Sequence, residues 1–106
     1  METANSDINI LIVEDSKVDS ALLEKFIQDY GYRITDIAPN AEKALESLNS
    51  QKPDLILMDI LLEKSINGIE LARKIRENHN IPIIFVTSLH AGLFCLQVSE
   101  EIHMSP

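Results

Sequence analysis

The 106-residue sequence contains few of the residues that crosslink a chain or anchor it in a membrane. Its one cysteine, Cys95, cannot form an internal disulfide, and we expect it to serve as a small hydrophobic residue of the core. No apolar run approaches the roughly 20 residues that a membrane-spanning helix needs. Residues 1–9 are polar and lack the basic and apolar regions of a secretory signal. These features predict a cytoplasmic protein.

Basic residues are also scarce. The chain has 9 Lys and Arg against 17 Asp and Glu, which gives a net charge of −8. Because DNA, RNA and anionic membranes bind to basic surfaces, this balance argues against a nucleic-acid partner and against a membrane partner. It still allows phosphate chemistry if a divalent cation mediates the contact.

What the sequence does contain is an alternation of two hydrophobic patterns. Apolar residues make up 45% of the chain, enough for one small domain, residues 1–106, to bury a core. Continuous apolar runs predict buried strands at residues 8–13, 32–38, 54–60 and 81–88. Helical spacing predicts helices at residues 16–31, 40–50 and 67–80 and, from a poorer pattern, at 90–103. This alternation predicts a parallel α/β sheet covered on both faces.

Apolar residues also mark particular faces of the predicted helices. In the first helix one face carries Val18, Leu22, Phe26 and Tyr30, four residues apart, with Leu23 and Ile27 beside them. In the third helix Ile69, Ala72 and Ile75 are expected to point inward. Gly31 is a natural end for the first helix, and Asn40 a natural N-cap for the second.

Polar residues end three of the predicted strands. Glu14 and Asp15 follow the first strand, Asp59 ends the third and Thr87 ends the fourth. Parallel sheets bind ligands at the carboxyl ends of their strands, so we expect these residues to lie close together. Two like charges about 4 Å apart repel by about 4 kcal/mol at an effective dielectric of 20, and a cation would relieve that repulsion.

Carboxylates with a backbone carbonyl and waters are the ligand set of Mg²⁺. Beside such an ion, Asp59 could accept a phosphoryl group as an aspartyl phosphate, and Thr87 could hydrogen-bond a phosphoryl oxygen. Each residue alone also has a plain structural explanation. Glu14 and Asp15 could cap the helix that follows, Asp59 could form a turn, and Thr87 could be an ordinary β-branched strand residue. The joint pattern favours the metal site.

Four motifs in this order resemble the receiver domain of two-component response regulators. They are "LIVEDS" at 11–16, "DLILMDILL" at 54–62, "NGIELARKIR" at 67–76 and "IPIIFVTS" at 81–88. Together they cover most of residues 8–88, and residues 89–106 form an atypical C-terminal segment. The resemblance implies a flavodoxin-like, doubly wound parallel sheet with strand order 2-1-3-4(-5).

The resemblance also implies a mechanism. Asp59 would take a phosphoryl group from a phosphohistidine on a sensor histidine kinase or phosphotransfer protein. Mg²⁺ would be held by Glu14, Asp15, Asp59 and the backbone carbonyl of Leu61. Thr87 would move towards the phosphoryl group and thereby change the affinity for a partner. The added charge of the phosphoryl group would shift the equilibrium between two conformations. Such a module is not an enzyme in the usual sense; at most it catalyses its own aspartyl phosphorylation and dephosphorylation.

Two departures from the family pattern stand out. The segment after Asp59, "ILLEKSING", lacks a common proline and is one residue longer than usual. In addition, no Lys or Arg follows Arg76, whereas family members carry a Lys at the end of a fifth strand, followed by a fifth helix. These observations predict a C-terminally truncated receiver without the family's fifth strand, which leaves an open edge at the fourth strand. Residues 91–98 could fill part of that gap, or two chains could pair, and we expect either a homodimer or marginal stability.

Three other functions compete with a working phosphoacceptor. A degenerate or truncated receiver could bind a partner without effective switching. A Mg²⁺-dependent phosphohydrolase is disfavoured because Leu61 stands where many such enzymes carry a second acid. A flavin mononucleotide site is disfavoured because the loop of Glu14, Asp15 and Ser16 would repel a phosphate.

Overall fold

The computed structural model describes residues 8–62, 67–87 and 95–98, with Thr87 and residues 95–98 described as backbone. The strands are β1 (Asn9–Val13), β2 (Arg33–Ala38), β3 (Leu55–Asp59), β4 (Ile83–Thr87) and β5 (Cys95–Val98). The helices are α1 (Lys17–Asp29), α2 (Ala41–Ser50) and α3 (Gly68–Asn78). The strands and helices alternate in the described chain up to β4, as the hydrophobic pattern predicts.

The strands form one sheet with the order β2-β1-β3-β4-β5. β1 pairs in parallel with both β2 and β3, and β3 pairs in parallel with β4. In this register Val13 of β1 lies beside Met58, and Asp59 lies beside Val86 of β4. The carboxyl ends of β1, β3 and β4 therefore meet at one edge, and the predicted parallel sheet and strand order are confirmed.

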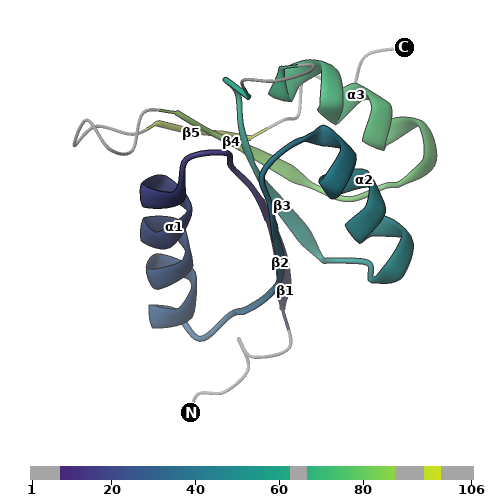
Figure 1. Ribbon diagram of the computed structural model, residues 1–106. Helices are drawn as coiled ribbons and strands as arrows, with labels where there is room; N and C mark the ends of the chain where they lie inside the picture. The colour runs from purple at the N-terminus through teal and green to yellow at the C-terminus, as the bar shows by residue number, and fades with distance from the viewer. Residues whose placement is uncertain (1–7, 63–66, 88–94, 99–106) are drawn as a thin grey trace.

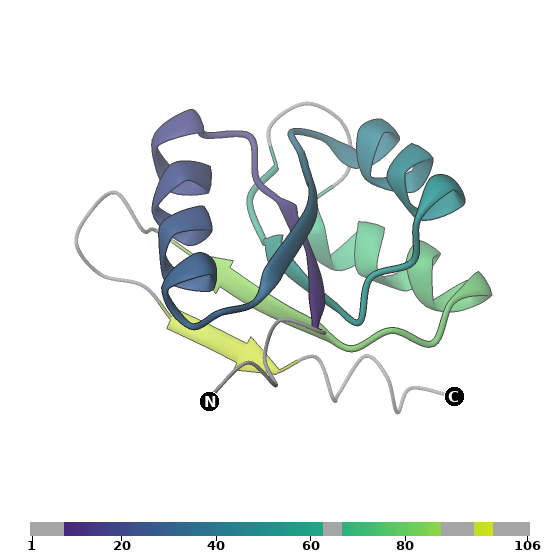
Figure 2. The same cartoon turned by 90° about the horizontal axis from the view of Figure 1, so that it is seen from below.

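Helices cover both faces of the sheet, with α1 on one face and α2 and α3 on the other (Figures 1 and 2). The larger apolar cluster lies under α2 and α3 and includes Leu11, Ile56, Met58, Leu71 and Ile75. The smaller cluster lies under α1 and is built around Ile10, Ile12, Leu23, Ile27 and Leu57. Because β1 and β3 are buried on both faces, their continuous apolar sequences are explained.

Side-chain caps start all three described helices. Ser16, Asn40 and Asn67 each precede a helix and accept a hydrogen bond from the backbone N–H three residues later. After α1, Gly31 adopts a φ of 87°, a conformation that favours glycine, and the chain turns into β2. The predicted roles of Asn40 and Gly31 are confirmed.

Two helix faces differ from the prediction. Leu23 and Ile27 of α1 are buried, but the four-residue stripe beside them remains in solvent, with Val18 63% and Tyr30 68% exposed. In α3, Ala72 and Ile75 are buried as predicted, whereas Ile69 is exposed and Leu71 fills the core instead. The apolar faces of α1 and α3 are therefore wider than the area of each helix that packs on the described sheet, and the outer part of each face is exposed.

The expectation of a helix over residues 90–103 is wrong for residues 95–98, and within the segment 91–98 it is these residues that fill part of the gap beside the fourth strand. These residues form β5, which pairs with β4 in antiparallel fashion, from Ile84 beside Val98 to Thr87 beside Cys95. β5 therefore occupies the edge of β4 that was expected to be open. The other residues of the atypical segment 89–106, and the side chain of Cys95, lie outside the described residues.

None of the described helices is long and apolar enough to cross a membrane.

Candidate functional site at the carboxyl ends of β1 and β3

Three carboxylates converge where β1 and β3 end. Glu14 and Asp15 directly follow β1, and Asp59 is the last residue of β3. One carboxylate oxygen from each of the three lies within 4.8 Å of the other two. Among the side chains that the structure describes, this is the one such group that could hold a metal ion. The predicted convergence of these residues is thus present in the structure.

Glu14 is held in place by the start of α1. Its backbone N–H donates to the carbonyl of Ala38 over 2.9 Å, which ties it to the end of β2. Its carboxylate accepts a hydrogen bond of 3.0 Å from the backbone N–H of Ser16, the N-cap of α1. Glu14 is buried. The helix-cap and metal-site explanations of this segment are compatible, because the residues that start α1 also position an acid at the site.

Asp59 is held by the backbone that follows it. Its Oδ1 accepts a hydrogen bond of 3.1 Å from the N–H of Leu61. The N–H of Ile60 donates to the carbonyl of Val86 over 3.3 Å, which connects the turn to β4. The side chain is half-buried, so Asp59 lies at the rim of the core, where its carboxylate can still be reached from solvent.

Gly68, the first residue of α3, packs against the backbone of Asp59. Its N–H donates to the carbonyl of Ile60 over 2.7 Å. A Cβ added at Gly68 would overlap the carbonyl oxygen of Asp59 and would also crowd the Cα of Ile60. Only glycine allows the end of β3 and the start of α3 to approach this closely.

The cluster is crowded with negative charge. Burial raises the pKa of Glu14 from its ordinary 4.5 to about 8; the N–H of Ser16 opposes this rise, and the nearby charge and hydrogen bond of Asp59 add to it. Burial also raises the pKa of Asp59, against the opposing effect of hydrogen bonds with Leu61 and Glu14. Without a cation, the raised pKa of Glu14 therefore favours its protonated form near neutral pH.

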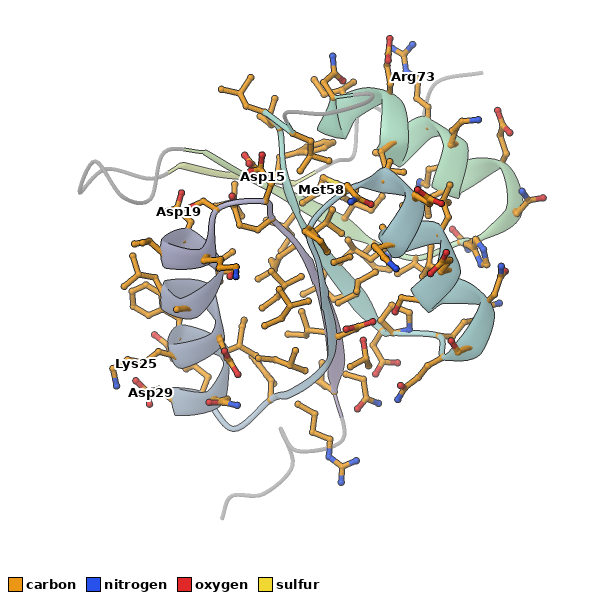
Figure 3. All side chains as sticks on the ribbon, viewed as in Figure 1. Asp15, Asp19, Lys25, Asp29, Met58 and Arg73 are labelled. Atoms are coloured by element: carbon orange, nitrogen blue, oxygen red, sulfur yellow. The ribbon has the colours of Figure 1, made fainter. Side chains whose placement is uncertain are left out.

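Asp19 is a fourth acid that the sequence analysis missed. It is buried in the first turn of α1, and its charge acts on both Glu14 and Asp59. Asp15 and Asp19 lie at the same end of the molecule, whereas Lys25 and Asp29 lie further along α1 (Figure 3). The four-residue spacing between Asp15 and Asp19 was a usable signal, because it suits a shared location near the start of a helix.

These residues fit a divalent cation. The three converging carboxylates supply the hard oxygen ligands that Mg²⁺ prefers, and the raised pKa of Glu14 reflects the cost of holding the buried cluster fully charged without a cation. The N–H of Leu61 donates to the carboxylate of Asp59. Leu61, whose backbone carbonyl is a predicted ligand, therefore lies in the turn that directly follows Asp59. The predicted contact of Thr87 with a phosphoryl group concerns a side chain outside the described residues, although the end of β4 lies beside Asp59.

Comparison with known proteins agrees with this arrangement. The sequence profile of the response regulator receiver domain matches residues 10–101. A protein-glutamate methylesterase/protein-glutamine glutaminase of Hahella chejuensis is 36% identical over 96 residues, which cover 88% of this chain and 27% of that protein. The response regulator ArlR of Staphylococcus saprophyticus is 39% identical over 79 residues, 74% of this chain and 35% of ArlR. The chain thus spans about a third or less of these relatives.

Solved structures show the same fold. The N-terminal domain of a response regulator/sensory box/GGDEF protein of Carboxydothermus hydrogenoformans has a TM-score of 0.70 and 39% identity, over 74% of this chain and 63% of that one. The anti-anti-sigma factor PhyR of Bartonella quintana, in complex with the anti-sigma factor NepR, has a TM-score of 0.75 and 28% identity, over 84% of this chain and 40% of that one. This chain belongs to the response regulator receiver domain family.

Proposed function

We propose that Asp59 accepts a phosphoryl group from a phosphohistidine of a sensor histidine kinase or phosphotransfer protein. Membership of the receiver family supports a phosphoacceptor module, and the convergence of Glu14, Asp15 and Asp59 within 4.8 Å carries the assignment of the residue. Among the three acids, Asp59 ends the central strand β3 and has the N–H of Leu61 fixing one carboxylate oxygen. This leaves its side chain oriented and partly accessible for attack on a phosphorus atom.

In the proposed transfer a carboxylate oxygen of Asp59 attacks the phosphorus atom. The new O–P bond forms as the P–N bond to the partner's imidazole breaks, and the departing imidazole nitrogen takes up a proton from water. Glu14, Asp15, Asp59 and the backbone carbonyl of Leu61 would hold Mg²⁺. When bound, the ion would neutralise negative charge on the phosphoryl oxygens.

Residues of this chain position the acids of the site and set the charge on their oxygens. Ser16 holds the carboxylate of Glu14, and Gly68 lets α3 close against the backbone of Asp59. The N–H of Leu61 withdraws charge from one oxygen of Asp59, so that the other is left to react. We propose that the hydroxyl of Thr87, at the end of β4, contacts the phosphoryl group once it is bound. The resulting movement of Thr87 would transmit phosphorylation to a surface that binds a partner.

We propose further that residues 1–106 form a single receiver domain that acts in the cytoplasm through protein partners. The relatives are named a protein-glutamate methylesterase/protein-glutamine glutaminase and a response regulator, and PhyR was solved in complex with the protein NepR. The net charge of −8 suits a protein partner with a basic surface better than a nucleic acid.

A small phosphoramidate, which carries a P–N bond like that of phosphohistidine, tests the assignment. We expect Mg²⁺-dependent formation of a hydroxylamine-sensitive acyl phosphate, mapped by peptide mass spectrometry to residues 54–62. Asp59→Asn should abolish it. Asp54→Asn is the matched control, since Asp54 lies at the opposite end of β3, where it accepts a hydrogen bond from the N–H of Asn9. Modification that persists in Asp59→Asn would refute the assignment.

A further inference from the structure

A cavity of about 310 Å³ lies between the end of β2 and one side of α2. Its lining includes Asp36 and Ile37 of β2, Pro39 after the strand, and Lys43, Glu46 and Ser47 of α2. None of the three converging acids of the phosphoacceptor site lines it. A volume of this size lies at the lower end of the range that small-ligand sites occupy. The cavity is therefore a second place where this chain could hold a ligand group.

Ser47 brings a buried polar group to the cavity. The residue is 7% exposed, yet it lines the cavity. The hydroxyl of Ser50, which also lies there, donates to the carbonyl of Glu46 over 3.4 Å. Within the described residues the hydroxyl of Ser47 makes no such bond. Because a buried hydroxyl is costly to leave without a hydrogen bond, Ser47 favours an occupant of the cavity that can bond to it.

Carboxylates outnumber cations around the Ser47 hydroxyl. Asp36 and Glu46 each bring a carboxylate, and Lys43 brings the one cation among the lining residues. Lys43 pairs with Glu46 over 3.7 Å, but the two side chains are 59% and 61% exposed, and an exposed pair of this kind opens easily. Asp36 accepts a hydrogen bond of 2.8 Å from the N–H of Ile37, and no cation in the described part of the chain pairs with it. The cavity therefore carries an excess of negative charge.

We propose that this cavity binds a guanidinium group, carried either by an arginine side chain of a partner protein or by a free guanidinium compound. A guanidinium is planar and offers up to five N–H donors and no acceptor, which matches the oxygens of Asp36, Glu46 and Ser47. It is more weakly hydrated than an ammonium, so it tolerates the apolar side of the cavity, where Ile37 and Pro39 lie. The net charge of −8 attracts such a cation to the chain.

Other classes of ligand match the cavity less well. An anion would meet the carboxylates of Asp36 and Glu46, with only Lys43 to bind it. An uncharged ligand would leave Asp36 without a cation. A metal ion would make no use of Ile37 and Pro39, and the metal-binding group among the described side chains lies at the ends of β1 and β3 instead.

Titration of the full chain with N-butylguanidinium, followed through its backbone amide signals by NMR, tests the proposal. Saturable shifts should appear at residues 36–38 and 43–50, and N-butylurea, which has nearly the same shape and no charge, should cause none. Ser47→Ala should weaken binding about tenfold, because it removes an acceptor for a charged donor. Ser20→Ala is the matched control and should bind normally, since α1 lies on the opposite face of the sheet (Figures 1 and 2).

Two peptides identify the source of the group. They are acetyl-Ala-Arg-Ala-amide and its citrulline counterpart, which has the same shape without the charge. Tighter binding of the arginine peptide than of N-butylguanidinium, with no binding of the citrulline peptide, assigns the cavity to a partner protein. Equal or tighter binding of N-butylguanidinium assigns it to a free guanidinium compound.

A second pair of variants keeps the test decisive if Ser47→Ala does not fold. Lys43→Gln removes the cation that competes for Glu46 and should strengthen binding severalfold, which a damaged fold cannot do. Lys25→Gln makes the same change of net charge on α1 and should leave binding unchanged. The proposal would be overturned by an absence of saturable shifts, by equal shifts with N-butylurea, or by unchanged affinity in either folded Ser47→Ala or Lys43→Gln. Equal strengthening by Lys25→Gln and Lys43→Gln would overturn it as well.

Discussion

Gly68 lies directly against the carbonyl of Asp59, so that the first residue of α3 and the last residue of β3 share a space that has no room for a side chain. This contact fixes the end of β3 independently of the hydrogen bonds made by the carboxylate itself. The geometry of Asp59 therefore depends on a residue nine positions later in the chain.

Gly68→Ala should push the backbone of Asp59 away from Glu14 and Asp15. We expect a loss of stability of about 1–3 kcal/mol, typical of overpacking, together with weaker Mg²⁺ binding and slower phosphorylation. Gly31→Ala is the matched control: it places alanine at a φ of 87° far from the site and should cost about 1–2 kcal/mol without changing Mg²⁺ affinity. Denaturant unfolding and titration calorimetry would separate the two effects, and equal Mg²⁺ affinity in both variants would contradict this role of Gly68.

The raised pKa of Glu14 predicts how stability depends on pH. The folded chain holds this proton between pH 4.5 and about 8, whereas the unfolded chain has lost it. The contribution of Glu14 to stability is therefore complete below pH 4.5 and declines as the pH rises to and through 8. Without metal, the melting temperature should fall between pH 6 and 9, and it should fall less in Glu14→Gln.

Comparing the two proteins cancels the effects of titrating groups that do not interact with Glu14, so an identical slope in both would refute this prediction. The same proton competes with a cation, because Glu14 must lose it to become a ligand. Mg²⁺ should accordingly raise the melting temperature of the unmodified chain more at pH 8.5 than at pH 6. Chelation with EDTA should remove this difference.

Asp15 and Asp19 should affect Mg²⁺ binding to different extents. Asp15 offers an oxygen to the cluster, and Asp15→Asn should weaken Mg²⁺ binding by about 10–100-fold or more. Asp19 acts through its charge, so Asp19→Asn should weaken binding only severalfold. Asp36→Asn, at an exposed position of β2, is the control and should bind Mg²⁺ normally. Calorimetric titration would check the order, which would be contradicted if Asp19→Asn had the larger effect.

The sequence pattern was sufficient to predict the first four strands and the acids at their ends, and the resemblance to receiver domains implied the strand order. Continuous apolar runs identified β1 and β3 as buried parallel strands, and parallel strands end at the same edge, so Glu14, Asp15 and Asp59 had to meet. The role of Gly68 was not predictable in this way, because it depends on how closely two backbones approach. Asp19 was missed because a polar residue in an amphipathic helix pattern is ordinarily assigned to solvent.

The C-terminal part was the least predictable. A run of four apolar or uncharged residues such as 95–98 fits a strand or a helix equally well, and pairing with β4 decides between them. The stripe of Val18 and its neighbours on α1 shows the same limit: periodicity identifies an apolar face but not whether another element covers it.

The central claim is that Asp59 is a working phosphoacceptor, and the intact mass of the chain tests it most directly. The chain and its Asp59→Asn variant would be incubated with acetyl phosphate, with Mg²⁺ or with EDTA, after circular dichroism has shown that both are folded. We predict the addition of one phosphoryl group to the unmodified chain, only with Mg²⁺ and never to Asp59→Asn. A folded chain that gains no phosphoryl group with Mg²⁺ would contradict the account and favour a receiver that binds partners without accepting phosphate.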